Sequence, residues 1–206
     1  MEDVNEKVKK IKQSLHQLMD GAVAQSMRDK GVNYKLNWGA TLPHLSQMAE
    51  EIKTDSVNLK SLAIALWKED VRECKILATM IMPPDEMLPE VADIWMEQTP
   101  TQEIAEQAAF NLYQHLPYAP EKAYRWIASD NELYQLCGFH ILSRIFMRGE
   151  TPNERGINEL IDQAIAAIQG SGLGVRKAAM NCLQRFSELG LVYERITASA
   201  LRTVKL

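Results

Sequence analysis

The chain has 206 residues, of which 46% are hydrophobic and 24% are charged, and its formal net charge is −4. These proportions are typical of a globular protein and exclude a disordered or collagen-like chain. The net charge of −4 also means that the chain lacks the excess of basic residues that most nucleic-acid-binding proteins carry. No apolar run approaches the ~20 residues of a membrane-spanning helix, and the N-terminus alternates charges where a signal peptide needs an apolar stretch. We therefore expect a cytoplasmic protein without membrane contact.

Cysteines and histidines indicate neither a disulfide framework nor a metal site. Cys74, Cys137 and Cys182 lie far apart in apolar stretches, which predicts small buried core residues. The four histidines are widely scattered, and no pair has the spacing of a zinc motif. The sequence therefore predicts no metal and no cofactor, and it does not specify an oligomeric state.

From the N-terminus onward, apolar residues recur every three or four positions, which is the helical period, and no segment has a convincing strand pattern. Residues 59–81 predict a helical hairpin with its turn at residues 69–71. Further helices begin at residues 99–102, 129–132 and 151–154, where the capping-box pattern satisfies the first backbone amides. We expect about ten or eleven helices joined by short turns.

The predicted hairpins resemble one another. Trp67, Trp95 and Trp126 end successive first helices at steps of 28 and 31 residues. Each second helix then carries a small residue where two helices can approach closely. These residues are Ala78, Ala108, Cys137 and Ala178. The loose period predicts an all-α fold, an α-α superhelix of stacked HEAT-like helix pairs, and the alternative is an irregular helical bundle.

Two segments resemble a known family. Residues 38–49, from Trp38-Gly39 through Pro43 to Ala49, are similar to the opening signature of the DNA alkylation repair family, the AlkD-like alkylpurine DNA glycosylases. Residues 62–78 resemble the next segment of that family, in the same order and at the same spacing. Because no linker or low-complexity stretch divides the chain, we expect a single domain over residues 1–206. The resemblance implies a C-shaped solenoid of HEAT-like pairs with a concave face that holds DNA.

The catalytic residues of that family are only partly present. The family places a Trp and, four residues later, an Asp on one helix, and these positions fall on Gln102 and Glu106. An Arg of the next repeat falls on Leu136. The resemblance thus leaves Glu106 as the candidate catalytic carboxylate, which would stabilise the developing positive charge on the sugar. Its neighbours Glu103 and Gln107 favour instead an exposed helix face.

The C-terminal part of the resemblance is also altered. The late Trp and Arg of the family fall on Asn181 and Gln184, although Arg185 is one residue away. The sequence therefore predicts a degenerate glycosylase site.

Charge is unevenly distributed along the chain. Residues 61–120 contain 3 Lys and Arg against 10 Asp and Glu, whereas the segments before and after are close to neutral. Because duplex DNA is bound mainly through its phosphates, the acidic middle segment opposes DNA binding unless its carboxylates lie away from the DNA. We identify six basic candidates for phosphate contacts, of which Lys35 lies beside the aromatic candidate Trp38. They are Lys35, Arg144, Arg148, Arg176, Lys177 and Arg185, and the alternative is that they form ordinary solvated surface.

Three hypotheses for function follow. The first is an AlkD-like protein that binds DNA by shape and backbone contacts without base excision. The second is a protein-interaction scaffold whose acidic middle segment holds a basic partner. The third is an active alkylpurine DNA glycosylase that uses Glu106.

Overall fold

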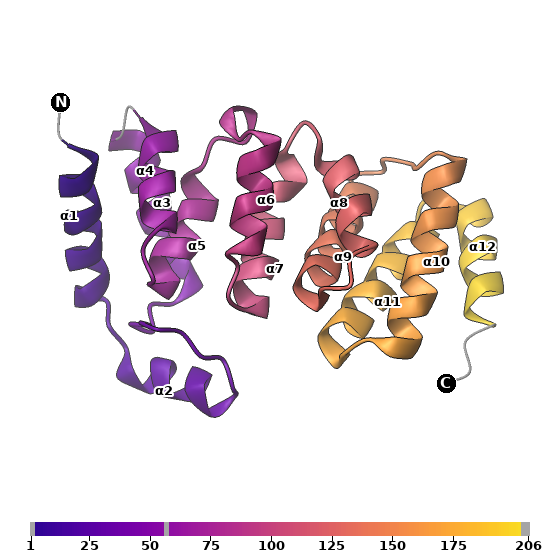
Figure 1. The fold of residues 1–206 in the computed structure, drawn as a ribbon, viewed down its shortest axis with the longest axis horizontal. Coiled ribbons are helices and arrows are strands. Elements are labelled where there is room, and N and C mark those ends of the chain that lie inside the picture. Colours follow the sequence, from indigo (N-terminus) through magenta and orange to yellow (C-terminus); the bar gives the residue numbers. More distant parts are fainter. Residues whose placement is uncertain (1–2, 56–57, 203–206) are drawn as a thin grey trace. The chain divides into compact units, whose positions relative to one another are not determined.

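The computed structural model describes residues 3–55 and 58–202. The chain divides into two compact units, Met1–Leu112 and Tyr113–Leu206, which we call unit 1 and unit 2. Throughout the described ranges the secondary structure is helical, with no strand and one isolated bridge between Leu36 and Val71. The all-α prediction is confirmed (Figure 1).

Unit 1 contains seven α-helices and one short 3-10 helix among its described residues. They are α1 (Val4–Gln17), α2 (Gly21–Asp29), α3 (Leu42–Asp55), α4 (Leu59–Trp67), α5 (Arg72–Ile81), η1 (Pro84–Glu86), α6 (Pro89–Glu97) and α7 (Gln102–Asn111). The predicted hairpin is the pair α4 and α5. The helix predicted to begin at residues 99–102 is α7, but its cap lies two residues later than the predicted capping box. The Thr101 hydroxyl accepts a hydrogen bond from the Ile104 amide, whereas the Thr99 hydroxyl donates to the Trp95 carbonyl oxygen.

The core of unit 1 is built around α5, which packs against α3, α4 and α7. Of its ten residues all but Met80 are buried. Two of the repeating tryptophans meet here: Trp67 of α4 and Trp95 of α6 stack with ring centroids 4.3 Å apart and planes 3° apart. The tryptophan period in the sequence thus reflects a shared packing position.

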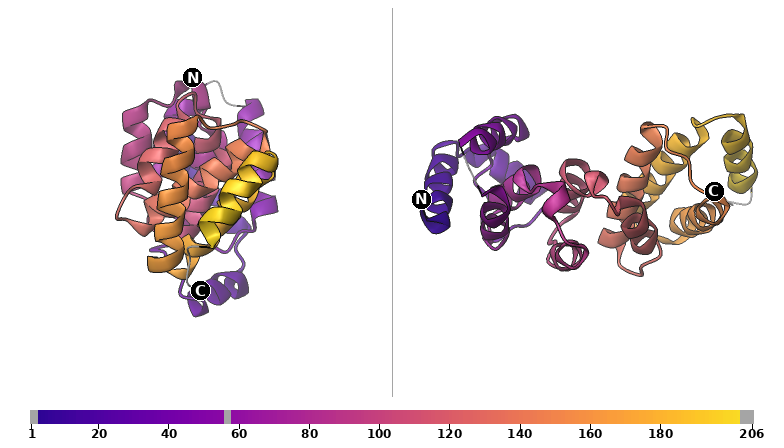
Figure 2. Two further views of the ribbon diagram at one scale, coloured as in Figure 1. Left: turned by 90° about the vertical axis from the view of Figure 1, so that its right-hand side faces the viewer. Right: turned by 90° about the horizontal axis from the view of Figure 1, so that it is seen from above.

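Unit 2 contains five α-helices and one 3-10 helix among its described residues. They are η2 (Tyr113–His115), α8 (Ala119–Ile127), α9 (Glu132–Met147), α10 (Glu154–Gly170), α11 (Leu173–Ser187) and α12 (Leu191–Leu201). Helix α9 packs against α8 and α11, and α11 also packs against α10 and α12. Figure 2 shows α10 and α12 side by side at the C-terminal end.

The core of unit 2 is mainly aromatic and aliphatic. Trp126 of α8 meets Tyr113 and Tyr134 edge to face, and Phe186 of α11 contacts Phe146. Helices α8 and α9 cross closely at Gly138, where a Cβ atom would lie 2.8 Å from the Ala123 carbonyl oxygen. Only glycine fits this crossing.

The cysteine prediction is confirmed, since all three thiols are free and buried. Burial raises the pKa of the Cys74 thiol to about 12, so it is protonated at neutral pH. None of the helices in the described residues is long and apolar enough to cross a bilayer.

Candidate nucleic-acid interface

A buried ionic cluster lies at the start of α5. It consists of Tyr34, Arg72, Glu73 and Glu103, and Arg72 and Glu73 are 2% and 0% exposed. The Arg72 guanidinium binds Glu103 through two parallel hydrogen bonds of 2.9 and 2.6 Å, and it also contacts Glu73 at 3.1 Å. A bidentate pair of this kind is strong and holds its partners in one geometry. The cluster therefore fixes α7 against α5.

Glu73 also holds the loop that carries the family-like Trp-Gly pair. Its carboxylate accepts hydrogen bonds from the backbone amides of Trp38, Gly39 and Ala40, at 3.0 to 3.3 Å. Gly39 has φ +79°, and a Cβ there would lie 2.2 Å from the Asp20 carbonyl oxygen. The Trp-Gly signature is thus a structural element, because glycine alone permits this backbone path.

Glu103 is an integral part of this cluster and does not lie on a solvated surface. Its side chain is 22% exposed, and it accepts hydrogen bonds from Arg72 and from the Tyr34 hydroxyl. Burial by itself raises the pKa of Glu103, but the hydrogen bonds from Arg72 and Tyr34 outweigh it and hold the pKa below its usual value. The prediction that Glu103 marks an exposed helix face was therefore wrong.

Glu106, the candidate catalytic carboxylate, lies one helical turn beyond Glu103 on α7 and is half-buried. It accepts a hydrogen bond of 2.8 Å from Gln102, the residue that the resemblance aligns with the family's Trp. In that alignment an amide stands where the family has an aromatic ring.

The other aligned positions also differ from a catalytic arrangement. Leu136 is 2% exposed and belongs to the core of unit 2, so its position offers no cation. Asn181 and Gln184 are exposed on α11, and the Gln184 amide donates to Glu188 at 3.4 Å. These side chains supply neither the aromatic surface nor the positive charge of the family's site.

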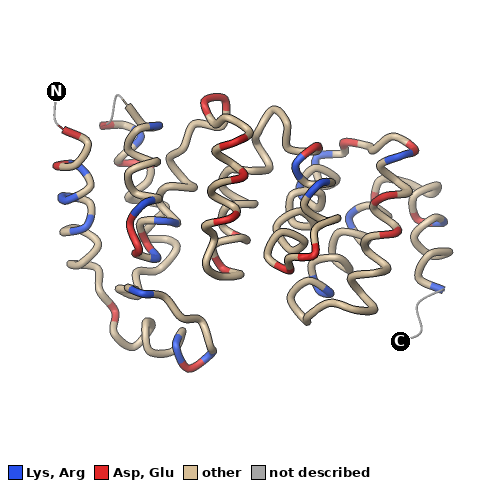
Figure 3. Tube along the Cα trace, in the orientation of Figure 1, with Lys and Arg blue, Asp and Glu red and all other residues tan. Residues whose placement is uncertain are grey.

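The helices around Glu106 are strongly acidic. Between Lys75 and Lys122 the sequence contains no Lys or Arg and eight Asp or Glu residues. Figure 3 marks Asp and Glu positions along α6 and α7 and no Lys or Arg position. Most of these eight acidic residues are exposed, and exposed carboxylates repel a phosphate backbone.

Three of the six basic candidates are bound to carboxylates. Lys35 pairs with Asp70 at 2.9 Å, and Arg185 pairs with Glu188 at 2.9 Å. Arg148 pairs with Glu150 at 2.9 Å and also donates to the side chain and backbone of Gln114. Lys35 nevertheless has 79% of its side chain exposed, so a phosphate can reach it.

Arg176 and Lys177 differ from these three. Both are exposed on the first two turns of α11, and neither has an ion pair within the part of the chain that the structure describes. They share one face of α11 with Asn181 and Gln184 and line an open pocket of about 780 Å³ between α11 and α12. Arg144, on α9, is half-buried and lies 4.0 Å from the Met147 sulfur.

Trp38, the aromatic candidate, is 8% exposed and lies in unit 1 with the edge of the His16 ring against it. Within residues 3–55 and 58–202, no cluster of three His, Cys, Asp or Glu side chains is arranged to hold a metal ion.

Comparison with known proteins assigns the family. The family model described as "DNA alkylation repair enzyme" matches residues 11–188. The chain belongs to this family. Members are expected to share the helix-pair fold described above, and the Trp38-Gly39 turn falls within the matched range.

A solved structure supports the same fold. It is reported as "A new family of proteins related to the HEAT-like repeat DNA glycosylases with affinity for branched DNA structures". It matches with a TM-score of 0.80 and 18% sequence identity over 96% of this chain and 83% of that chain. The chain therefore has the HEAT-like repeat fold. None of the curated proteins compared with the chain matches it.

Sequence reasoning missed the ionic cluster. Arg72 and Glu73 were expected only to open a helix, because charged residues at a helix start are usually solvated. The one available signal was the sequence 71–77, in which three charged residues are interspersed with four apolar ones, so that a helix has no purely polar face for solvent.

Proposed function

We propose that this member of the DNA alkylation repair family binds DNA through its backbone and shape, with a preference for branched DNA, and does not excise alkylated bases. The observation that carries the proposal is the contrast between α7 and α11. Helix α7 keeps a carboxylate but pairs it with Gln102, whereas α11 presents Arg176 and Lys177 to solvent. The proposal treats residues 1–206 as one functional domain in the cytoplasm.

Support for DNA as the partner comes from family and fold. The chain belongs to a DNA-repair family, and the matched solved structure belongs to proteins with affinity for branched DNA. At a junction two DNA arms meet at an angle, so phosphates of both arms can face one protein surface. A few cations can therefore favour a junction over a straight duplex without contacting the bases.

Support for lost excision comes from the residues that align with the family's other catalytic groups. Loss of one contact that stabilises a transition state typically lowers a rate by ~10²–10³. At the aligned positions the family's aromatic and cationic groups are replaced by Gln102 and Leu136, and on α11 by Asn181 and Gln184. These losses act in the same direction, although they need not add.

The test is DNA binding by fluorescence anisotropy with a labelled four-way junction and a linear duplex of equal length, at several salt concentrations. We expect tighter binding of the junction and a steep loss of affinity with salt. The double variant Arg176→Ala/Lys177→Ala should weaken binding of both DNAs and reduce the salt slope by about two, about one per lost phosphate contact.

Arg155→Ala is the matched control, because Arg155 is an exposed cation of the neighbouring helix α10 and lies outside the α11 pocket. It should leave affinity nearly unchanged. Absence of DNA binding at low salt, or equal losses in both variants, would overturn the proposal.

The acidic surface favours a second candidate function. Helix α6 and the residue before it combine carboxylates with two exposed apolar side chains, Leu88 and Ile94, which are 57% and 49% exposed. Such a mixed surface suits a basic protein partner. If the protein binds no DNA, loss of partner capture on substituting Leu88 and Ile94 by Ser would favour the scaffold function.

A further inference from the structure

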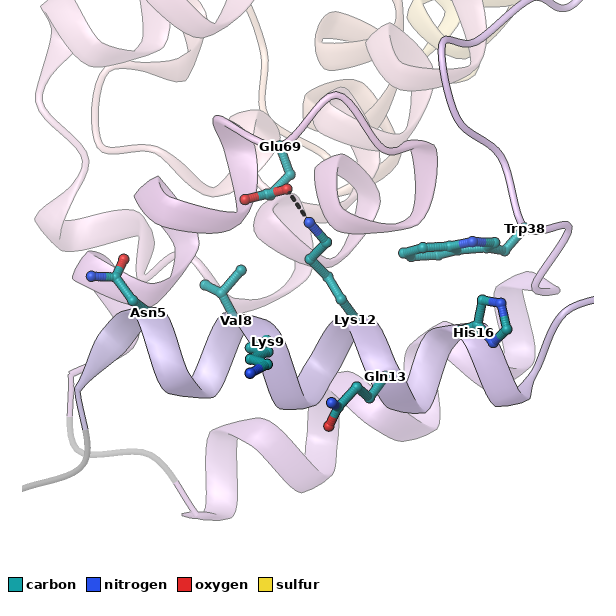
Figure 4. A pocket seen from close by; sticks show the side chains of 8 residues that line it. All are labelled: Asn5, Val8, Lys9, Lys12, Gln13, His16, Trp38 and Glu69. Carbon is teal, nitrogen blue, oxygen red and sulfur yellow. Dashed lines mark hydrogen bonds and ion pairs between the residues drawn. The ribbon is translucent and has the colours of Figure 1, made fainter.

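Unit 1 contains a cavity that lies apart from the positions aligned with the family's catalytic residues. It measures about 510 Å³ and lies between α1 and the loop that carries Trp38 (Figure 4). Six of its lining residues come from one face of α1, and Trp38 and Glu69 close the other side. This volume is in the usual range for small-molecule sites.

One side of the cavity is aromatic. The His16 ring stands edge-on to the Trp38 ring, with centroids 6.3 Å apart and planes at 80°. His16 is exposed, whereas Trp38 is held in place because its backbone amide and those of the next two residues bind Glu73. The pair thus places a fixed aromatic ring beside an exposed one, and aromatic side chains stack on unpaired nucleobases.

Apart from the apolar Val8, the remaining lining is polar and contains two lysines and one glutamate. Lys12 bonds Glu69 at 2.6 Å across the cavity, and Lys9 lies on the same helix face one turn away. Gln13 adds an exposed amide. An apolar ligand would make no use of Lys9 or Gln13, and a duplex phosphate would make no use of the aromatic rings. A nucleotide uses both, because its base stacks and its phosphate pairs with lysine.

The surrounding charge fits the same ligand. Helix α1 contains four lysines, at positions 7, 9, 10 and 12, and one glutamate, Glu6, whereas the charged residues of α6 and α7 are all carboxylates (Figure 3). Lys9 and Lys12 line this cavity, whereas Lys7 and Lys10 line a second pocket together with Glu51 and Asp55. The cavity side of α1 therefore offers a cation to the phosphate of a single nucleotide.

We propose that the α1 cavity binds an unpaired nucleotide at the branch of a DNA substrate. The base lies against Trp38 and His16, the 5′ phosphate contacts Lys9, and Glu69 accepts a hydrogen bond from an exocyclic amine of the base. This inference rests on the proposed branched-DNA function and names the part of the substrate that unit 1 recognises.

The test compares a fully paired four-way junction with the same junction carrying a short unpaired flap at the branch, by fluorescence anisotropy. A third arm titrates free deoxynucleoside monophosphate. We expect the flapped junction to bind about tenfold tighter than the paired one, from stacking of one base. The double variant Lys9→Ala/His16→Ala should abolish this preference and leave binding of the paired junction nearly unchanged.

The matched control is Lys10→Ala/Gln17→Ala, which removes one lysine and one exposed side chain from α1 outside the cavity. It should retain the preference for the flap. Intrinsic fluorescence gives a second measurement, because Trp38 is the most exposed of the four tryptophans, the others being 1–3% exposed. We expect the flap to quench this fluorescence, and Trp38→Phe to remove the quenching.

The outcomes separate this inference from the proposed function. If both junctions bind equally, or if both double variants lose the flap preference to the same extent, the α1 cavity is not the nucleotide site although the protein binds branched DNA. If free nucleotide quenches Trp38 as effectively as the flap does, the cavity is a site for a free nucleotide and the DNA assignment is overturned. If neither junction binds, the proposed function fails and this inference fails with it.

Discussion

Units 1 and 2 use charge in opposite ways. Unit 1 contains 18 Asp and Glu against 12 Lys and Arg, and it buries Arg72 and Glu73 and most of Lys75 within the single helix α5. Unit 2 contains 9 acidic and 11 basic residues, and among its described residues its buried charge is Lys122, at 4% exposure. Its core is aromatic, and Arg176 and Lys177 remain on its surface.

The comparison shows two different ways in which the fold is held together. In unit 1 the charged side chains act in folding, because they fix the Trp38 loop and α7 to α5. In unit 2 hydrophobic packing maintains the fold, so cations stay available to a ligand. Net charge alone does not separate these roles.

The largest expected effect is on the stability of unit 1. Arg72→Met leaves Glu73 and Glu103 buried without their cation, and breaking a buried pair in this way costs about 3–5 kcal/mol of unfolding free energy. Unfolding in urea, monitored by circular dichroism, measures this loss of unfolding free energy. Lys35→Met is the control, since it breaks a fully exposed pair and should change the unfolding free energy little. Equal losses in the two variants would show that the ionic cluster is not a structural element.

The corresponding test in unit 2 is a packing change. Gly138→Ala places a methyl group 2.8 Å from the Ala123 carbonyl oxygen and should cost about 1–3 kcal/mol by overpacking. Gly170→Ala, where nothing lies within 4 Å of the added Cβ, should be close to neutral in the same urea experiment. An unchanged free energy of unfolding in Gly138→Ala would mean that α8 and α9 do not cross this closely.

A smaller effect is expected from pH. The pKa of Glu103 is below its ordinary value of 4.5 in the folded protein, so ionised Glu103 stabilises the fold above about pH 4.5. This contribution is lost as the pH falls from 4.5 through the lowered folded pKa. The melting temperature of Glu103→Gln should therefore fall less between pH 6 and pH 3 than that of the parent protein. The control Glu150→Gln changes an exposed residue of unit 2 and should leave the pH dependence of the melting temperature as in the parent protein. The same pH dependence in Glu103→Gln and in the parent would contradict the stabilising role of ionised Glu103.

The fold was predictable from the sequence to a larger extent than the site. Helical periodicity and the tryptophan spacing are local signals, and they identified the α4–α5 hairpin and the close-packed small residues, such as Ala78 and Ala108, which are fully buried. The buried cluster depends instead on Tyr34, Arg72 and Glu103 meeting across 31 to 69 residues of sequence. Periodicity cannot report such long-range pairing, and for that reason Glu103 was assigned to an exposed face.

The six basic candidates also differ in how much of their surroundings the sequence could predict. Arg176 and Lys177 were predictable as exposed cations because their helix has a regular apolar face formed by residues such as Val175 and Ala179. The Arg185–Glu188 pair has the i, i+3 spacing of a helical ion pair, which the sequence shows. The pairs that hold Lys35 and Arg148 depend instead on turn geometry and side-chain direction, which composition does not give.

The measurement that tests the central claim most directly is release of 3-methyladenine and 7-methylguanine from methylated DNA, under the conditions in which the protein binds a four-way junction. Binding without excision is the predicted result: no release above the protein-free background, and no change on Glu106→Gln. Robust release by the parent protein that Glu106→Gln abolishes would contradict the account, and it would establish Glu106 as the carboxylate of an active alkylpurine DNA glycosylase.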